Sequence, residues 1–467
     1  MIRLTNAEIK DFDFDAQRKR ALDLWESAFA MVDVEGSDEI DLKLFYTCLY
    51  HVLLDPRVSA DVDGSFTLNG KAMKDDSYIH RTVFSGWDIY RSEFPLLSII
   101  RPDIVNDEVN SLLRIAEENN SSFPRWELLG INAGCMVGDP GAIVVADAYL
   151  KNIRKFDVQK AYDIIVASTK GEKELFNKEF HTIRPVCEQY LKEAYVPEKL
   201  SDTLEYLLAD YTMYLFSKEK GDKENEEFFL RRVKSYKDNF NENLGFLAPR
   251  KENGEFVFEE DEYDDDGCVE SNIFQQTWFI PYDVIGLSKL FGEARTLELL
   301  ERFFENADLG RLWNDDYNHS NEPCHNITHY FSMLGLAHRT QYWTRRVQKE
   351  AYRIGANGKF SIEVVDYAKA IGAFPNHSQI TIDQIREKAI STLKTVGTPI
   401  MSNYFSNTKT SVFEMNSLIS DFREKFVEAL ASEKLFINMG VKVEALTVDS
   451  FHVNEEDLDM IRSHING

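Results

Sequence analysis

The chain has 467 residues, of which 43% are hydrophobic and 28% charged, a composition ordinary for a globular protein that buries one or two cores. Its 79 acidic and 53 basic residues give a net charge of −26, and so acidic a surface argues against a nucleic-acid partner. No apolar run reaches the roughly 18 residues of a membrane-spanning helix, and the N-terminus lacks the apolar stretch of a signal peptide. We therefore expect a soluble protein without a membrane segment.

Apolar residues recur with helical spacing along most of the chain, and alternating strand patterns are nearly absent. The first amphipathic stripe includes Leu22, Trp25 and Phe29. Similar runs predict helices at 15–32, 42–54, 87–94, 103–118, 141–152, 158–168, 201–217, 226–240, 276–290, 294–304 and 326–335. Helices joined by loops of varied length predict stacked helix pairs, and periodicity alone does not distinguish a toroid from a solenoid or a bundle.

A carboxylate followed by aromatic and amide residues marks the stretch 267–283, GCVESNIFQQTWFIPYD, with Glu270 at its centre. Aromatic rings stack on sugar rings, amides bind hydroxyl groups, and a carboxyl group in a partly apolar pocket can have a pKa high enough to donate a proton. The structural alternative is that a Glu before a hydrophobic helix is stabilised by the helix dipole, and this stretch alone favours that interpretation.

The stretch 319–330, HSNEPCHNITHY, brings several possible ligands close together. They are Asn321, Glu322, His325 and Asn326. Oxygen donors of this kind suit a hard cation such as calcium. Zinc would prefer thiolates or several imidazoles, and Cys324 beside His325 lacks the usual paired spacing. A capped loop that leads into a helix is the structural alternative.

The two stretches together resemble glycoside hydrolase family 92, the calcium-dependent exo-acting α-mannosidases. VESNIFQQTWFIPYDV is similar to the acid-bearing segment of that family, and SNEPCHNITHYFSMLG to its NEP segment. Three further matches precede them in the expected order: FYTCLYHVLLDPR at 45–57, VFSGWDIYRSEFPLLSIIRPDIVNDEVNSLL at 83–113 and PRWELLGINAGCMVGDPGAIVVADAYLKNI at 124–153. The resemblance covers residues 12–344, and five collinear motifs of this length are highly specific.

The resemblance implies a mainly α fold in which an (α/α)6 toroid gathers its site loops at one end of the barrel. The family carries a β-sandwich domain before this barrel, and we expect the chain to lack it. After residue 375 the composition changes, with amphipathic runs at 380–396, 411–433 and 455–464 and a short strand predicted within 436–448. We therefore predict an α-mannosidase-like domain at 1–375 and an additional α-rich segment at 376–467.

The resemblance also implies a reaction, the inverting and calcium-assisted hydrolysis of terminal, α-1,2-linked mannose from glycans. Glu270 is then the general acid, and calcium near Asn321 and Glu322 binds the 2- and 3-hydroxyls of mannose. The residues expected to line the sugar pocket are Trp87, Asp88, Asn272, Gln275 and His325. Without the resemblance, Trp87 is explained as a core residue and Asp88 as an ion-pair partner of Arg91.

The second carboxylate of an inverting glycosidase is not found at its expected place. Such enzymes hold a base about 6.5–9.5 Å from the acid. The family takes it from an aspartate pair in a GNDDCGQMSAW-like segment, and an alignment anchored on GAFP at 372–375 puts that pair at Asn357 and Gly358.

Three explanations are open for the missing base. Another carboxylate, such as Glu363, Asp366 or Asp315, is the base; or the protein binds mannose without cleaving it; or the C-terminal part of the sequence is rearranged. The alternative function is therefore that of an inactive mannose-binding or structural homologue.

Overall fold

The computed structural model describes residues 7–9, 13–36, 39–257, 261–309, 313–350, 354–364, 369, 388–389, 392–393, 419–431, 434–438 and 441–453. This part of the chain is mainly helical, as predicted. It divides into two compact units: Met1–Leu299 with Glu322–Tyr330, and Leu300–Asn321 with Phe331–Gly467. The (α/α)6 arrangement and a domain boundary after residue 375 stay predictions.

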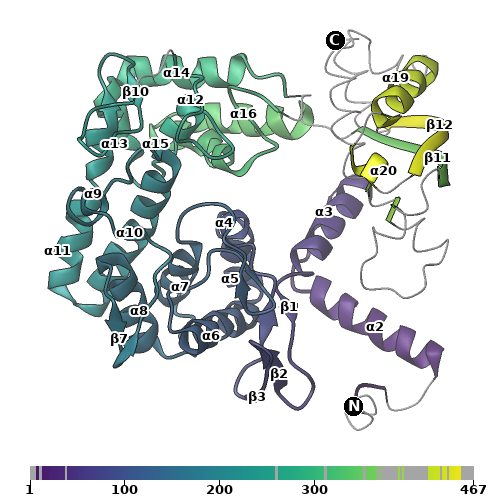
Figure 1. Cartoon of the computed structure of the whole chain (residues 1–467), viewed down its shortest axis with the longest axis horizontal. Helices are drawn as coiled ribbons and strands as arrows, with labels where there is room; N and C mark the ends of the chain where they lie inside the picture. The colour runs from purple at the N-terminus through teal and green to yellow at the C-terminus, as the bar shows by residue number, and fades with distance from the viewer. Residues whose placement is uncertain are drawn as a thin grey trace. The chain divides into compact units, whose positions relative to one another are not determined.

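The first unit consists of helices and short antiparallel hairpins (Figure 1). Its helices are α2 (Phe14–Phe29), α3 (Glu39–Val52), α4 (Gly86–Ile89), α5 (Glu93–Ile100), α6 (Pro102–Asn119), α7 (Pro140–Leu150), α8 (Val158–Lys170), α9 (Glu188–Glu193), α10 (Leu200–Lys220), α11 (Lys223–Arg232), η1 (Ser235–Asn239), α12 (Ile273–Thr277), α13 (Val284–Phe291), η2 (Glu322–Cys324) and η3 (Ile327–His329). The paired strands are β1 (Arg57–Val58) with β4 (Arg81–Thr82), β2 (Ser65–Leu68) with β3 (Lys71–Lys74), β5 (Glu127–Leu128) with β6 (Ile131–Asn132), β7 (Glu174–Leu175) with β8 (Lys178–Glu179), and β9 (Phe240–Asn241) with β10 (Phe246–Leu247). In the described part of the chain, no helix is both long and apolar enough to cross a bilayer.

Helices α7 and α11 pack against α10, and α6 packs against α7 (Figure 1). The apolar residues of α10, such as Leu204, Leu207 and Met213, are fully buried. The start of α7 is fixed locally, because the Asp139 side chain accepts a hydrogen bond from the Ala142 N–H. Packing of α7 and α11 against α10 positions the loops that adjoin these helices.

Some of the helices predicted from periodicity, among them the runs 226–240 and 276–290, are shorter than the apolar pattern indicated. The run 226–240 leaves the α-helix at Arg232 and continues as the 3-10 helix η1. The run 276–290 is interrupted after Thr277, and α13 starts anew with Asp283 as its cap and Pro281 just before it. Proline cannot donate the backbone hydrogen bond of a helix interior, so the helix breaks near Pro281. The apolar spacing continues across this break and therefore predicted one long helix.

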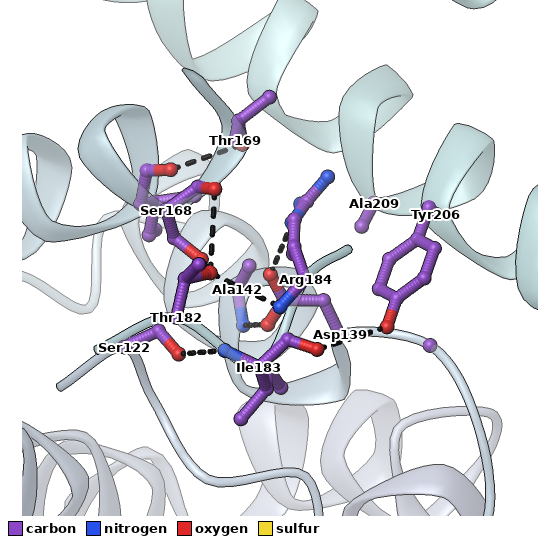
Figure 2. Close-up of polar contacts among 12 residues, drawn as sticks. Ser122, Asp139, Ala142, Ser168, Thr169, Thr182, Ile183, Arg184, Tyr206 and Ala209 are labelled. Atoms are coloured by element: carbon purple, nitrogen blue, oxygen red, sulfur yellow. Dashed lines mark hydrogen bonds and ion pairs between the residues drawn. The ribbon is translucent and has the colours of Figure 1, made fainter. Parts of the chain in front are cut away.

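Polar contacts fasten the segment after β8 to helices α8 and α10 and to the loop after α6 (Figure 2). The Ile183 N–H donates to Ser122 Oγ over 3.0 Å, and the Tyr206 hydroxyl donates to the Ile183 carbonyl over 3.3 Å. The hydroxyl of Thr182 lies 2.5 Å from that of Ser168. These contacts hold the backbone next to Arg184 in one position.

The Arg184 side chain belongs to a buried series of acidic and basic side chains that alternate in charge. Its Nε donates to Asp139 over 2.6 Å and its Nη1 to Asp210 over 2.6 Å, and Arg232 Nε donates to the other oxygen of Asp210 over 2.7 Å. All four side chains are at most 5% exposed. Two acids are thus matched by two arginines in the interior, where an unpaired charge would be costly.

The second unit has a small aromatic core and a long two-stranded ribbon. Phe304 stacks on Trp343, and the Glu301 carboxylate accepts from the Trp343 indole over 3.0 Å. Its elements are the end of α14 (Glu293–Glu305), α15 (Tyr330–Met333), α16 (Ala337–Glu350), β11 (Ile354–Val364), α19 (Ile419–Ala431), α20 (Lys434–Asn438) and β12 (Val441–Val453). The antiparallel pairing of β11 with β12 confirms the strand predicted within 436–448, and α19 lies within the predicted run 411–433. Most of 380–396 and all of 455–464 lie outside the described residues.

Candidate functional site

The expected acid, Glu270, is exposed and has a backbone φ of 52°. A left-handed conformation costs a residue other than glycine roughly 1–3 kcal/mol, and it persists only where the surroundings hold it, most often at functional sites. Here the Val269 N–H donates to Ser201 Oγ over 2.9 Å, and Ser271 Oγ donates to Gln276 Oε1 over 2.8 Å. The residues on both sides of Glu270 are therefore anchored while its carboxyl group faces outward.

Asn272 and Gln275 form a capping box at the start of α12. The Asn272 side chain accepts from the Gln275 N–H over 2.9 Å, and Gln275 Oε1 accepts from the Asn272 N–H over 3.2 Å. Both side chains are at most 5% exposed. The helix start that the sequence offered as the structural alternative is thus present, and it fixes the backbone next to Glu270. Sugar binding by these two amides stays a prediction.

Trp87 lies in α4, 1% exposed, and its indole Nε1 donates to Glu205 Oε1 over 3.0 Å. The same carboxylate accepts from the Tyr90 hydroxyl over 2.9 Å and from Arg91 Nη2 over 2.5 Å. The Arg91 guanidinium also lies over the Trp87 ring, 4.7 Å from its centroid. Arg91 thus forms its ion pair with Glu205, so the sequence-based alternative in which it pairs with Asp88 is wrong.

Glu205 was missed by the sequence reasoning because it comes from the middle of α10 and belongs to no motif. The available signal was a pair of acids, Glu205 and Asp210, in an otherwise apolar run, since buried acids are normally paired. Glycine allows the close packing around this carboxylate: a Cβ on Gly138 would lie 2.9 Å from Glu205 Cβ, and one on Gly86 would lie 2.5 Å from the Arg125 carbonyl oxygen.

The carboxyl groups of Asp88 and Glu322 interact electrostatically in the folded chain, although the two residues lie far apart in the sequence. Burial raises the pKa of Asp88, against a hydrogen bond from Trp126 and the charge of Arg91. Burial also raises the pKa of Glu322, the charge of Asp88 raises it further, and Arg91 opposes the shift. Arg91 is therefore ion-paired with Glu205 and also acts electrostatically on the carboxyl groups of Asp88 and Glu322. We call these four residues the Arg91 cluster.

Two residues of the Arg91 cluster, Arg91 and Glu322, line a cavity of about 410 Å³ in the first unit. Apolar side chains such as Phe94 and Phe279 form part of its wall, and Arg91, Glu322 and His325 contribute polar groups. His325 is exposed, and η2, which carries Glu322, packs against α12. Partly apolar walls with a few convergent polar groups are typical of small-molecule sites.

The expected metal ligands offer oxygen donors. Asn321 is buried and Glu322 half-buried, and three residues before Asn321 both polar atoms of the buried Asn318 amide lack a hydrogen-bond partner within the described residues. No three His, Cys, Asp or Glu side chains of the described ranges form a metal-binding group. A cation here would therefore need amide or backbone oxygens as well, which suits calcium rather than zinc. Carboxyl groups raised in pKa by burial and by a neighbouring acid are also groups that a cation stabilises.

The segment aligned with the family's base lies in the ribbon of the second unit, where Asn357 is opposite Ser450 and Gly358 opposite Val448. Among the other carboxylates considered, Asp315 is exposed and Glu363 belongs to β11, while Asp366 lies outside the described residues.

Comparisons with known proteins address the family directly. Residues 3–360 match the model of the glycosyl hydrolase family 92 catalytic domain. The chain belongs to glycosyl hydrolase family 92. This confirms the resemblance seen in the sequence motifs. None of the curated proteins compared with the chain matches it.

Solved structures of family 92 enzymes share the fold of this family member. The α-mannosidase BT3965 from Bacteroides thetaiotaomicron is 26% identical with a TM-score of 0.67, over 73% of this chain and 46% of that one. The same enzyme in complex with mannoimidazole is 25% identical with a TM-score of 0.67, over 74% and 47%. The inverting mannosidase BT2199 from the same organism is 24% identical with a TM-score of 0.67, over 74% and 50%. The chain thus spans about half the length of the solved structures that it matches.

Proposed function

We propose that the protein is an α-mannosidase that hydrolyses terminal, α-1,2-linked mannose from glycans with inversion and with the help of calcium. The family membership supports the glycosidase part of this proposal, and the complex of BT3965 with mannoimidazole is that of a similar protein with a mannose analogue. The observation that carries it is the Arg91 cluster, where one guanidinium acts electrostatically on three carboxyl groups and where Arg91 and Glu322 line the cavity.

In the proposed mechanism, the Glu270 carboxyl group donates a proton to the leaving glycosidic oxygen. The anchored residues on both sides of Glu270 keep this group in place, so its orientation does not have to be achieved in each turnover. The buried Trp87 indole, held by Glu205 and covered by Arg91, helps to fix the Arg91 guanidinium beside the cavity, and Asp88 accepts hydrogen bonds from sugar hydroxyls. His325, exposed in the cavity wall, binds a further hydroxyl.

Asn321 and Glu322 are the residues that would hold calcium. When bound, calcium supplies positive charge that offsets the excess of carboxylates and orients sugar hydroxyl groups. Burial and the charge of Asp88 disfavour the negative form of Glu322, so a cation would stabilise this carboxylate. Activation of the attacking water is assigned to no residue.

A second candidate function is mannose binding without hydrolysis. It is favoured by one observation: Asn357 and Gly358, at the positions aligned with the family's base, carry no carboxyl group and lie in β11. In this case the Arg91 cluster would still bind mannose in a calcium-dependent way, and no product would form.

The test is prolonged incubation of the full chain with α-1,2-mannobiose, with calcium or with a chelator, while free mannose is followed. The proposal predicts calcium-dependent release that falls roughly 10²- to 10⁴-fold in Glu270→Gln, since general acid catalysis typically contributes that much. Because Glu270 is exposed, we expect the Glu270→Gln variant to fold like the original chain. Absence of release together with calcium-dependent mannose binding would select the second candidate. Release that is unchanged in Glu270→Gln would show that another residue is the acid.

A further inference from the structure

A basic hollow of about 690 Å³ lies on the first unit, at the ends of α9 and α11. Its basic lining residues are Lys192, Arg231, Arg232, Lys234 and Arg250. Only two acids, Glu193 and Asp238, line it as well. The local balance, five basic and two acidic side chains, is opposite in sign to the net charge of −26 of the whole chain. Such a reversal on an acidic protein is unexpected for a surface that serves solubility alone.

Two of the guanidinium groups are held in fixed positions. Arg232 is buried, with Nε bound to Asp210 over 2.7 Å and Nη1 bound to the Tyr190 carbonyl over 3.1 Å. Arg250 Nε donates to the Gly254 carbonyl over 3.2 Å, and its guanidinium lies 4.2 Å from the centroid of the Tyr195 ring. Since these contacts restrict both side chains, less conformational entropy would be lost when a ligand binds to them.

Part of this positive charge is not used by the protein. Arg232 Nη2 is buried, and no atom of the described residues forms a hydrogen bond with it. Arg231 and Lys234 are exposed, and neither forms an ion pair within the described ranges. Arg250 Nη2 is 3.7 Å from Glu193 Oε2, which is a loose contact. The hollow therefore presents donors from two segments without matching acceptors.

The simpler explanation is that basic residues near a helix C-terminus interact with the helix dipole. It accounts for Arg231 and Arg232, which lie in the last turn of α11. It does not account for Lys234 or for Arg250, since both lie outside that helix and reach the same hollow. Nor does it account for the unused Nη2 of Arg232.

We propose that the basic hollow binds a tetrahedral oxyanion of the phosphate or sulfate class. Guanidinium groups present paired N–H donors that match such oxygens, and a lysine adds a point charge. The site is separate from the Arg91 cluster, so it would operate whether or not the chain hydrolyses mannose. The oxyanion would be bound by Arg231, Lys234 and Arg250, with Arg232 at the buried side of the hollow.

Isothermal titration calorimetry of the full chain with inorganic phosphate and, separately, with sulfate tests this site, against sodium chloride at equal ionic strength. We expect saturable binding of at least one of the two oxyanions and none of chloride. The double variant Arg231→Gln/Lys234→Gln should bind at least about tenfold more weakly, since charge-assisted hydrogen bonds are lost. Both side chains are exposed, so the variant should fold normally, which circular dichroism checks.

The matched control is Lys71→Gln/Lys155→Gln, which removes the same charge from two exposed positions outside the hollow. It should bind the oxyanion like the original chain. Equal weakening in both double variants would show a general charge effect and overturn the proposal, as would the absence of saturable binding of either oxyanion. Binding of phosphate but not sulfate, or the reverse, would support the site and identify its preferred anion.

Discussion

Two groups of buried charges in the first unit differ in balance. In the series Asp139–Arg184–Asp210–Arg232, two acids meet two arginines, and Asp210 accepts from both. In the Arg91 cluster, one guanidinium acts electrostatically on three carboxyl groups, and burial raises the pKa of each of them. In a balanced series, each buried charge has a partner of opposite charge within the protein. In an unbalanced cluster, the excess negative charge has to be offset by protons, by a cation or by hydrogen-bond donors from a ligand. This difference separates the structural charges from the candidate site.

Removal of an acid from the balanced series should have the largest effect on stability. Asp210→Ala would leave Arg184 and Arg232 buried without their shared partner, and loss of one member of a buried pair typically costs roughly 3–5 kcal/mol. Urea denaturation measures this cost. The exposed pair Lys19–Asp23 provides the control, because Lys19→Ala should leave the midpoint unchanged. A loss below about 1 kcal/mol for Asp210→Ala would remove the distinction between the two groups.

Removal of an acid from the Arg91 cluster should lower activity and leave stability nearly unchanged. Glu322→Gln relieves repulsion with Asp88, so the free energy of unfolding should stay the same or rise slightly. Mannose release should fall about 10- to 100-fold, because loss of a group that holds or orients a metal typically costs that much. Initial rates and urea midpoints measure the two effects. The control is Glu188→Gln, which removes an exposed acid. A large loss of stability with unchanged activity in Glu322→Gln would contradict this expectation.

A further buried acid of the first unit, Glu108 in α6, should make stability depend on pH. Burial raises the pKa of Glu108 to about 8, and neither of its carboxyl oxygens has a hydrogen-bond partner within the described residues. Its pKa in the unfolded chain is about 4.3, so between these values the folded chain binds a proton that the unfolded chain lacks. Stability contributed by this group therefore falls as pH rises through that window.

Urea midpoints at pH 6 and pH 8.5 measure this dependence. The original chain should be more stable at pH 6, and Glu108→Gln should flatten the difference because a neutral amide does not titrate. Glu117, a half-buried acid on the same helix, gives the control variant Glu117→Gln, which should keep the dependence. An unchanged slope in Glu108→Gln would show that Glu108 is ionised in the folded protein.

A small gain in stability is expected when the strained backbone of Glu270 is relieved. Glu270→Gly removes the cost of a left-handed conformation, so the free energy of unfolding should rise by about 1 kcal/mol while mannose release is lost. Glu198→Gly is a matched variant, since Glu198 also has a positive φ of 61° and should be stabilised without loss of activity. Loss of stability in Glu270→Gly would mean that its side chain holds the loop together.

The sequence predicted what depends on local spacing. Helical periodicity located α6, α8 and α10, whereas it placed the start of the helix after Glu270 at residue 276 and missed the capping box of Asn272 and Gln275. Partners that lie far apart in the chain were not predictable in this way. Arg91 pairs with Glu205, 114 residues later, because that buried carboxylate needs donors more than the half-exposed Asp88 does. Likewise β11 could not be foreseen at 354–364, since its hydrogen bonds depend on a partner strand at 441–453.

The central claim, that calcium binds at Asn321 and Glu322 beside the unbalanced Arg91 cluster, is tested most directly by calorimetric titration of the chain with calcium in two buffers of different ionisation enthalpy. We expect binding that releases protons, because carboxyl groups with raised pKa lose them when a cation binds. Asn321→Ala and Glu322→Gln should each weaken the affinity at least about tenfold. Calcium binding that is equally strong in both variants, or absent from the original chain, would contradict the claim.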